Sequence, residues 1–358
     1  MHWRIIEKSD PLALEEMEAF VRTHPRGHFM QCPRWAKVKE FWDWRGIGVY
    51  EEGRMVGSLS VLIRPLPLGF SLLYGPRGPV CDREDPRVWE AFLEGLKQLA
   101  RDCRALLLYL DPDEPDGNGE FRNRLRKLGF REKEDGGFGN IQPQYVFRLD
   151  LEPGEEAVFR AFSPKTRYNI GLSARRGVTT RACSGANPIP DEALDQFARL
   201  MAITGERDGF RVRGKDYFAA LLKALGEDGI LWLAFFEGKP IAGAIEVFCR
   251  EKAWYLYGAS DNENRGTMPN YLLQWSMIRE AFNRGCRMYD FRGVPGETSE
   301  KDPLYGLYRF KKGFSGTYTK FTGLFSYSFR PVLGFAMMKL ISLRRRWRHR
   351  KGRNTGKL

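Results

Sequence analysis

The order of apolar and polar positions repeats once along the chain, at an offset of about 185 residues. In the first half, two strands around a glycine turn, a strand ending in Leu-Tyr-Gly, an amphipathic helix and a further strand follow one another, at residues 50–61, 73–75, 89–100 and 105–110. The same four elements follow in the second half, at residues 236–247, 256–258, 271–283 and 288–291. Four ordered landmarks predict two α/β domains with the same fold.

Helical stretches precede each copy of this pattern, at residues 11–23 in the first half and at 157–176 and 191–204 in the second. Helices, a β-meander, a helix and a strand in that order are typical of the GNAT acyltransferase fold. The expected fold class is therefore α/β, with mixed (α+β) sheets in two tandem GNAT-like domains. Enzymes of this fold that use acyl-CoA hold its pyrophosphate on an Arg-x-x-Gly-x-Gly/Ala turn before the helix. The corresponding loops, residues 75–81 and 261–269, lack this spacing, which disfavours acetyl-CoA.

The chain carries 58 lysines and arginines against 45 aspartates and glutamates, and the excess is confined to its end. Residues 1–302 hold 44 basic and 45 acidic groups, whereas the stretch from Pro303 onward has fourteen basic residues and no acidic one. Seven of the fourteen surround Trp347, directly after the apolar residues 332–343. Such a block favours RNA phosphates or an anionic membrane surface, or else it is a solvated solubility tail.

The sequence gives no sign of a membrane span, a leader or a metal site. No apolar run approaches the roughly 18 to 20 residues that cross a bilayer, and the first residues lack a secretory apolar region, so a cytoplasmic protein is expected. The six cysteines are scattered and only four histidines occur, which argues against zinc. We therefore expect neither a metal nor another cofactor.

Several short motifs resemble the Fem aminoacyltransferases, the FemABX family. Residues 163–178 resemble the opening of the family's second domain, and residues 306–314 resemble its Phe-Lys segment. Further matches are Gln31 with residues 35–39, Leu110-Asp111-Pro112, residues 206–218 and residues 254–257. The resemblance extends over roughly residues 5–335, and the order of these motifs within a doubled GNAT frame makes it specific.

The resemblance implies a cytoplasmic enzyme of peptidoglycan biosynthesis, and so of cell-wall biogenesis and cell shape. Family members transfer an amino acid from aminoacyl-tRNA to the side-chain amine of the third residue of a stem peptide, carried by lipid II or by UDP-MurNAc-pentapeptide. Their first domain is completed by a returning C-terminal strand or helix. We therefore expect residues 1–152 with about 318–343 as the first domain, residues 153–317 as the second, and residues 344–358 as a basic tail. The chain has no room for the coiled-coil arm of some relatives, so a compact member is expected.

Aminolysis of an ester requires a positioned amine, removal of a proton and stabilisation of the oxyanion. The resemblance assigns this work to Lys311, a cation that offsets the developing charge, with Phe310 orienting it. On the alternative interpretation, Lys311 and Lys312 are surface charges beside a strand. Asp111 ends an apolar run, where it would attract or deprotonate the incoming amine, although a plain turn explains it too.

By the same resemblance, Lys39 and Arg213 bind the phosphates of the precursor. Tyr217 and Tyr257 are expected to line the same groove, although core packing explains each of them as well. Basic side chains recur at about helical spacing and either contact tRNA phosphates or only solvate a helix, namely Lys165, Arg167, Arg175 and Arg176. Residues 332–353 are expected to contact an anionic membrane, unless their apolar part packs on the first domain.

Two other functions stay open beside the aminoacyltransferase. One is an acyl-CoA-dependent N-acyltransferase on the same doubled fold, which binding of acetyl-CoA would reveal. The other is a non-catalytic RNA- or membrane-binding protein, which would lose its function when residues 344–358 are removed. The resemblance favours the aminoacyltransferase, with aminoacyl-tRNA as co-substrate and the peptidoglycan precursor as acceptor.

Overall fold

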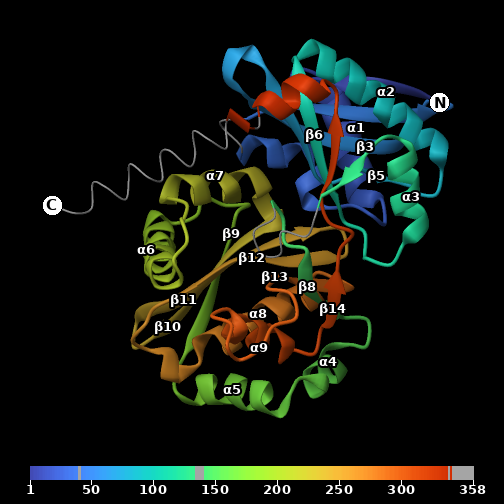
Figure 1. The fold of residues 1–358 in the computed structure, drawn as a ribbon. Coiled ribbons are helices and arrows are strands. Elements are labelled where there is room, and N and C mark those ends of the chain that lie inside the picture. The colour runs from blue at the N-terminus through green and yellow to red at the C-terminus, as the bar shows by residue number, and fades with distance from the viewer. Residues whose placement is uncertain (39–41, 134–140, 338, 341–358) are drawn as a thin grey trace.

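The computed structural model describes residues 1–38, 42–133, 141–337 and 339–340, which form two halves built on one mixed sheet each (Figure 1). The first sheet has the order β1 (His2–Ile6), β2 (Asp43–Glu51), β3 (Arg54–Pro65), β4 (Ser71–Arg77), β6 (Ala105–Pro112), β15 (Phe325–Ser328) and β7 (Arg131–Glu132), with β5 (Val80–Cys81) paired to β3. The second has the order β14 (Thr317–Lys320), β8 (Tyr145–Asp150), β13 (Met288–Val294), β12 (Lys252–Ser260), β11 (Lys239–Cys249), β10 (Gly229–Phe236) and β9 (Thr179–Ser184).

Helices and short turns cover the first sheet: α1 (Pro11–Thr23), η1 (Phe29–Gln31), η2 (Pro33–Val38), η3 (Pro67–Gly69), α2 (Pro86–Asp102) and α3 (Gly119–Lys127). Helix α2 begins where the Asp85 side chain accepts a hydrogen bond from the backbone N–H of Arg87, with a proline at the first turn. Its apolar face recurs at helical spacing through Phe92, Leu96 and Leu99, all buried in the core beneath the sheet.

The second sheet is covered on both faces, by α4 (Glu155–Ala161), α5 (Pro164–Arg175), α6 (Asp191–Asp208), α7 (Lys215–Leu225), η5 (Gly226–Asp228), η6 (Arg265–Thr267), α8 (Pro269–Asn283) and α9 (Tyr305–Lys312). Alternation along β10 explains the two layers, because successive strand residues point to opposite faces. Ile230 and Trp232 share a core with α8, whereas Leu231 and Leu233 share another with α6 and α7.

The predicted repeat is confirmed by the strand topology. Each half contains an antiparallel hairpin, β2–β3 or β10–β11, followed by a parallel pair, β4 with β6 or β12 with β13. Helix α2 or α8 connects the two parallel strands. Both halves therefore have the expected α/β fold with mixed sheets.

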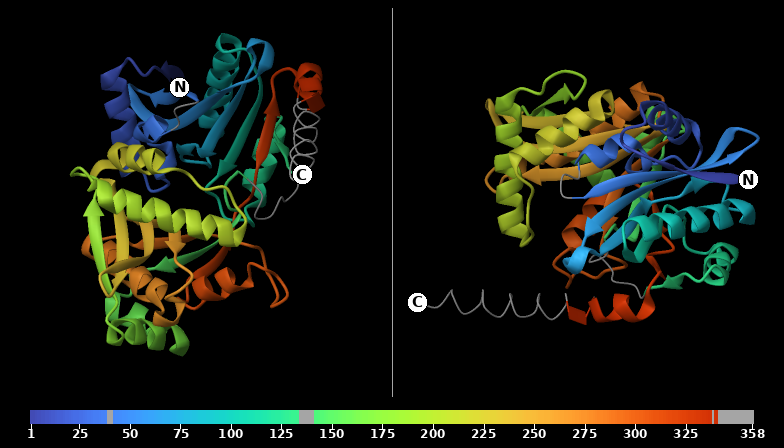
Figure 2. Two further views of the ribbon diagram at one scale, coloured as in Figure 1. Left: turned by 90° about the vertical axis from the view of Figure 1, so that its left-hand side faces the viewer. Right: turned by 90° about the horizontal axis from the view of Figure 1, so that it is seen from above.

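The chain crosses between the sheets near its C-terminal end. Strand β15 pairs with β6 and β7, so the chain returns to the first sheet as the red strand in Figure 2. Strand β14, however, pairs with β8, and β8 pairs with β13. By strand pairing, residues 145–150 and 317–320 thus belong to the second sheet, which differs from the boundaries at 152 and 318 expected from the sequence. The basic residues 344–358 lie outside the described part, within which no helix is long and apolar enough to cross a membrane.

The two halves share a core and a buried ionic network. The Phe29 ring lies 5.1 Å from that of Trp35 and 5.0 Å from that of Trp254 in the second half. Arg148 on β8 donates to Asp113 after β6 at 2.6 Å and to Asp290 on β13 at 2.9 Å. Because apolar packing and ion pairs both cross the boundary, the walls of the space between the halves are held in place.

Candidate active site

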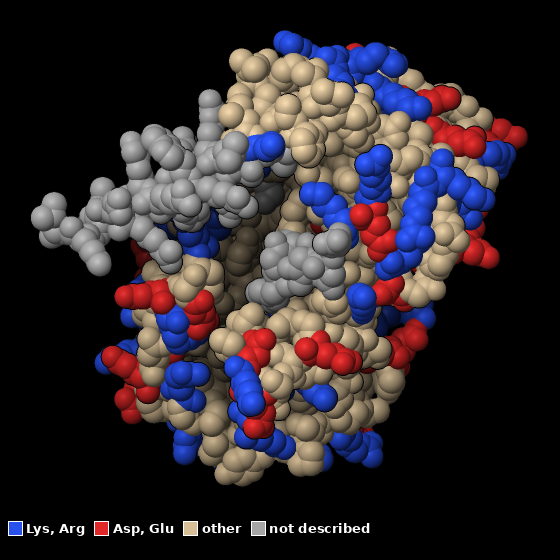
Figure 3. Space-filling model, viewed as in Figure 1, with Lys and Arg blue, Asp and Glu red and all other residues tan. Residues whose placement is uncertain are grey.

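A cavity of about 520 Å³ opens where the two halves meet, and Figure 3 shows a hollow in the surface between them. One wall comes from η2, β3 and β4, and the other from α7 and the loop before it. The polar and aromatic side chains that line it are Trp35, Trp42, Tyr74, Gln142, Arg213, Asp216 and Tyr217. A cavity of this size with a few convergent polar groups is typical of a small-molecule site.

Two residues predicted to bind substrate line this cavity, and a third is hydrogen-bonded to one of them. Arg213 and Tyr217 line it, and the Arg213 guanidinium lies 5.1 Å from the centre of the Tyr217 ring. The hydroxyls of Tyr217 and Tyr257 are 3.1 Å apart, which joins α7 to β12. Burial raises the pKa of Tyr217, so its hydroxyl stays protonated and can donate. Lys39, the predicted partner of Arg213, follows η2 and lies outside the described residues.

Asp111 lies at the end of β6, only 5% exposed. It accepts hydrogen bonds from the Tyr74 hydroxyl at 2.7 Å and from the backbone N–H of Arg77 at 2.8 Å, because parallel pairing sets β4 beside β6. Burial raises the pKa of Asp111, while the charge of Arg77 acts in the opposite direction. An acid in this setting can hold an ammonium group or accept a proton from it.

A chain of hydrogen bonds connects Asp111 to the second half. Tyr74 donates to Asp111 and is itself hydrogen-bonded to the side chain of Gln142. The Gln142 Oε1 atom in turn accepts a bond of 2.8 Å from Nη2 of Arg292 on β13. The predicted acid and the second sheet are therefore coupled across the floor of the cavity.

Lys311 lies in the last turn of helix α9, and its side chain is buried, with only 5% of the residue's surface exposed. Its Nζ donates to the carbonyl of Gly293 at 2.8 Å and lies 5.5 Å from the centre of the Tyr255 ring. Burial lowers its pKa to about 7, with Arg292 acting in the same direction and Asp290 opposing it. The alternative that Lys311 is a surface charge beside a strand is thus wrong, since the segment is helical and the side chain is buried. Near neutral pH such an amine can both accept and return a proton.

Phe310, the neighbour of Lys311, lines a second cavity of about 380 Å³. Its ring packs edge-on against Tyr271 at 5.0 Å and against Phe314 at 5.4 Å, so within the described residues its ring contacts do not include Lys311. The cavity lies between α9, the loop after β12 and the N-terminal end of α8, and it is also lined by Arg207, Asp261, Arg265 and Asn270. This is the loop that carries pyrophosphate in acyl-CoA-dependent relatives of the fold.

The two cavities are joined by a short series of neighbouring residues. Phe310 borders the smaller cavity, and Lys311 next to it bonds to the carbonyl of Gly293. Arg292, adjacent in β13, bonds to Gln142 at the larger cavity. Lys311 and Arg292 are therefore two ionisable residues that lie between the linings of the two cavities, although neither lines a cavity itself.

The four basic residues predicted to contact tRNA lie at helix α5, and all are exposed. Arg176, at the end of α5, donates to the carbonyl of Gly266 in the turn that borders the smaller cavity. Arg175 lies 5.9 Å from the centre of the Tyr168 ring. Lys165 and Arg167 lie in the first turn of α5, and this helix lies at the outer edge of the second half (Figure 1). Of these four residues, only Arg176 contacts the turn at the rim of the smaller cavity.

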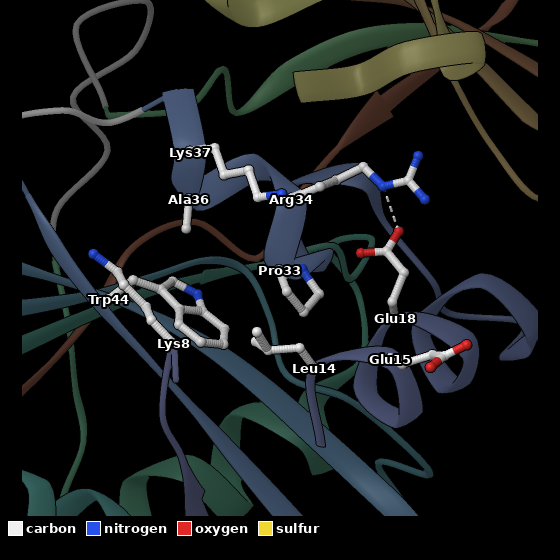
Figure 4. Close-up of a pocket in the computed structure, with 9 residues that line it drawn as sticks. All are labelled: Lys8, Leu14, Glu15, Glu18, Pro33, Arg34, Ala36, Lys37 and Trp44. Atoms are coloured by element: carbon white, nitrogen blue, oxygen red, sulfur yellow. Dashed lines mark ion pairs between the residues drawn. The ribbon is translucent and has the colours of Figure 1, made fainter. Parts of the chain in front are cut away.

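A further cavity of about 370 Å³ lies on the other side of η2 (Figure 4). Trp44, Leu14 and Pro33 form its apolar walls, and Arg34 is turned away from them toward Glu18, with an ion pair of 2.6 Å. Lys37 lines it, but none of the described residues predicted as catalytic or substrate-binding does. Across the described residues, no group of three or more side chains could hold a metal ion.

Tyr74, Gln142 and Arg292 belong to the site although the sequence analysis did not select them. A signal existed for Tyr74, because the Leu-Tyr-Gly landmark makes it the first-half counterpart of Tyr257. Gln142 and Arg292 meet only through the fold, and no local pattern distinguishes either.

A doubled GNAT frame with an acid at a strand end and a buried lysine between two cavities defines a tandem GNAT-fold acyltransferase. A tandem GNAT protein from the clavulanic acid biosynthesis pathway has the same fold, with a TM-score of 0.53 at 12% identity, over 91% of this chain and 98% of that one.

Comparisons with known proteins identify the family within this class. A model of the FemAB family matches residues 12–239 and 236–342, so the chain belongs to the FemAB family. The lipid II:glycine glycyltransferase of Staphylococcus saprophyticus is 30% identical over 374 residues, covering 84% of this chain and 88% of that one. The crystal structure of FemX superposes with a TM-score of 0.82 at 26% identity, over 92% of this chain and 98% of FemX. The predicted family, fold and enzyme class, an aminoacyltransferase, are thereby confirmed.

Proposed function

We propose that this protein transfers an amino acid from aminoacyl-tRNA to the side-chain amine of the third residue of a peptidoglycan stem peptide, with lipid II as the acceptor. The observation that carries the proposal is the buried Lys311 between two separate cavities, one for each substrate. The similarity to a protein named lipid II:glycine glycyltransferase supports this acceptor over a nucleotide-linked one. The aminoacyl ester is the co-substrate, and the reaction requires no further cofactor.

The larger cavity is proposed to hold the acceptor. Arg213 offers an exposed cation for the precursor's phosphates, and Tyr217 and Tyr257 supply hydroxyls and aromatic faces beside it. Asp111 faces this end of the site through Tyr74 and would hold the acceptor amine as an ammonium before it reacts. Lys39 keeps its expected role at the phosphates.

The chemistry proceeds by direct attack. The acceptor ammonium first gives one proton to the Asp111 carboxylate, which later releases it to solvent. The neutral acceptor nitrogen then bonds to the ester carbonyl carbon, and a second proton passes from it to the neutral Nζ of Lys311. The resulting Lys311 cation offsets the charge on the tetrahedral intermediate. As the bond between the carbonyl carbon and the ribose oxygen breaks, Lys311 returns the proton to that oxygen. An amide and a tRNA with a free hydroxyl leave, and Lys311 is neutral again.

The smaller cavity is proposed to hold the aminoacyl end of the tRNA. The N-terminal end of α8, a helix of 15 residues, and the side chain of Arg265 offer positive potential to the terminal phosphates. Phe310 and Tyr271 supply ring faces for an unstacked base. Exposed Arg167, Arg175, Arg176 and Lys165 extend the positive surface to the acceptor arm.

A lipid-linked acceptor places the reaction at the cytoplasmic face of the plasma membrane. Residues 331–337 are helical, and Val332 and Phe335 in them are 82% and 73% exposed. Arg330 and Lys339 flank this apolar surface. We propose peripheral contact with anionic lipids through residues 332–353, part of which lies outside the described residues.

A transfer assay tests the proposal. Purified protein is incubated with a pool of radiolabelled aminoacyl-tRNAs and either lipid II or UDP-MurNAc-pentapeptide, and the stem peptide is then weighed by mass spectrometry. A gain of one or more amino acids that RNase abolishes is the expected result and names the donor. No gain with either acceptor, together with binding of acetyl-CoA, would overturn the proposal in favour of an acyl-CoA-dependent enzyme.

A further inference from the structure

Strand β13 is interrupted at the active site by a bulge. Its pairing with β8 shifts register between Asp290 and Gly293, and Arg292 within the shift has a φ of +59°. A non-glycine residue adopts this conformation at a cost of about 1–3 kcal/mol, and such strain often accompanies a functional role. Bulges re-aim side chains. This one turns the Gly293 carbonyl toward Lys311 and lets Arg292 reach Gln142 in the floor of the larger cavity.

Among the described residues, the Arg292 guanidinium forms no ion pair, and the nearby Asp290 carboxylate favours its charge without bonding to it. Its Nη2 donates to the neutral Oε1 of Gln142, and only its backbone N–H bonds to a carboxylate, that of Asp290 at 2.6 Å. Within the described part of the chain, no carboxylate forms an ion pair with it, and Nε and Nη1 donate to no protein acceptor. The like-charged Arg77 lies near enough to disfavour its charge. A cation enclosed in this way is stabilised by an incoming anion.

The surroundings of Arg292 fit a small anion that arrives with the acceptor. Gln142 and Tyr74 line the larger cavity, and Tyr74 and Tyr257 are close enough to Arg292 to influence its charge. Arg292 also lowers the pKa of Lys311, which places the two cations at short range. A group bound at Arg292 therefore lies within reach of both the acceptor cavity and the reacting amine.

We propose that Arg292 binds a carboxylate of the stem peptide that neighbours the acceptor amine, and so selects which peptide is modified. This inference rests on the proposed function. Two carboxylates of a stem peptide meet the description. One is the second carboxylate of a diamino dicarboxylic acid, on the same carbon as the amine, and the other is the free carboxylate of the glutamyl residue before it. An amidated glutamyl residue followed by lysine offers neither.

The test uses four lipid II acceptors, with lysine or diaminopimelate at the third position and a free or amidated glutamyl carboxylate before it. The full-length protein is compared with Arg292→Gln and Arg292→Lys, and with Arg287→Gln as a matched control. Arg287 precedes the same strand but is 61% exposed and paired with Glu152. Transfer from the accepted aminoacyl-tRNA gives kcat/KM for each pair. Binding of the four free stem peptides is followed by the fluorescence of Trp35 and Trp42, which line the cavity.

The wild-type protein is expected to prefer at least one carboxylate-bearing acceptor over the neutral one by about tenfold or more, as a charge-assisted bond allows. Arg292→Gln is expected to lose that preference, because kcat/KM should fall about tenfold more on the preferred acceptor than on the neutral one. Arg292→Lys should keep part of the preference, and Arg287→Gln all of it. The acceptor that shows the preference identifies which carboxylate is bound.

Three results would overturn the inference. One is a wild-type protein without preference, another is an equal loss on all four acceptors in Arg292→Gln, and the third is full preference retained in that variant. A purely structural role would lower the melting temperature and all four rates together. If the wild-type protein modifies none of the acceptors, the proposed function fails. In that case the inference is tested by the fluorescence binding measurement alone. Equal affinities of the wild-type protein and Arg292→Gln for carboxylate-bearing peptides would refute it.

Discussion

Replacing Lys311 by methionine should stabilise the protein while it impairs catalysis. Burial lowers the pKa of this lysine from 10.5 to about 7, so the folded state binds the proton about 3,000-fold more weakly than the unfolded chain, which corresponds to about 5 kcal/mol. At pH 7, where the unfolded chain is protonated, this weaker proton binding lowers the free energy of unfolding by about 4 kcal/mol. Losing the bond from Nζ to the Gly293 carbonyl costs about 2 kcal/mol. Lys311→Met is therefore expected to raise the free energy of unfolding by about 2 kcal/mol at pH 7.

The sign of the pH dependence follows from the same reasoning. Because folding lowers the pKa of Lys311, the unfolded chain holds more protons between pH 7 and 10.5, and the wild-type protein gains stability as the pH rises through this window. Methionine does not titrate, so Lys311→Met should change from stabilising the protein by about 2 kcal/mol at pH 7 to destabilising it by about 1 kcal/mol at pH 10. Urea unfolding at both pH values measures it.

The exposed neighbour offers a control, since Lys312 lies over the Tyr308 ring at 5.6 Å outside the core. Lys312→Met should change the free energy of unfolding by less than about 0.5 kcal/mol at either pH. The reasoning is refuted if Lys311→Met destabilises the protein at pH 7, or if its effect is the same at pH 7 and pH 10. In the transfer assay, Lys311→Met should lower kcat by about a hundredfold or more and change the acceptor KM little.

Three further predictions test the remaining parts of the site. The ratio of wild-type to Lys311→Met turnover should rise with pH through about 7, because the neutral amine accepts the proton and the acceptor titrates alike in both proteins; a flat ratio contradicts the relay. Arg213→Ala should raise the acceptor KM about tenfold with kcat nearly unchanged, whereas an equal fall in kcat would remove its assigned role. Arg148→Met leaves Asp113 and Asp290 buried and unpaired and should cost about 3–5 kcal/mol in urea unfolding, against less than about 1 kcal/mol for the exposed Arg87→Met.

Local sequence patterns predicted much of the architecture but little of the geometry inside the site. The repeat was visible because equivalent strands keep their apolar spacing, and the same repeat could have identified Tyr74 from Tyr257. The expected domain boundary at residue 152 placed residues 145–150 in the first domain, whereas strand β8 pairs with β13, which comes far later in the chain. The bulge at Arg292 depends on that distant pairing, and no sequence spacing encodes it.

Resemblance located Lys311 and Asp111, but their chemical states come from burial. Neither motif indicates that Lys311 bonds to a backbone carbonyl or that its charge is disfavoured, since both depend on the packing of α9 against β13. Phe310 is a similar case. The resemblance assigned it to orienting Lys311, whereas consecutive helical residues point in different directions, and its ring lines the smaller cavity.

The two halves of the repeat have the same fold but divide the work between them. In the second half, the loop between β12 and α8 borders an open cavity of about 380 Å³. In the first half, the equivalent loop is filled by the Gln31 side chain, which is fully buried, bonds to the Pro76 carbonyl at 2.6 Å and packs directly against Gly78. The first-half loop is thus closed, whereas the second-half loop borders the cavity that we propose for the donor. On the proposed function, the two equivalent loops of the duplicated frame therefore have different roles, because only the second has room beside it for a substrate.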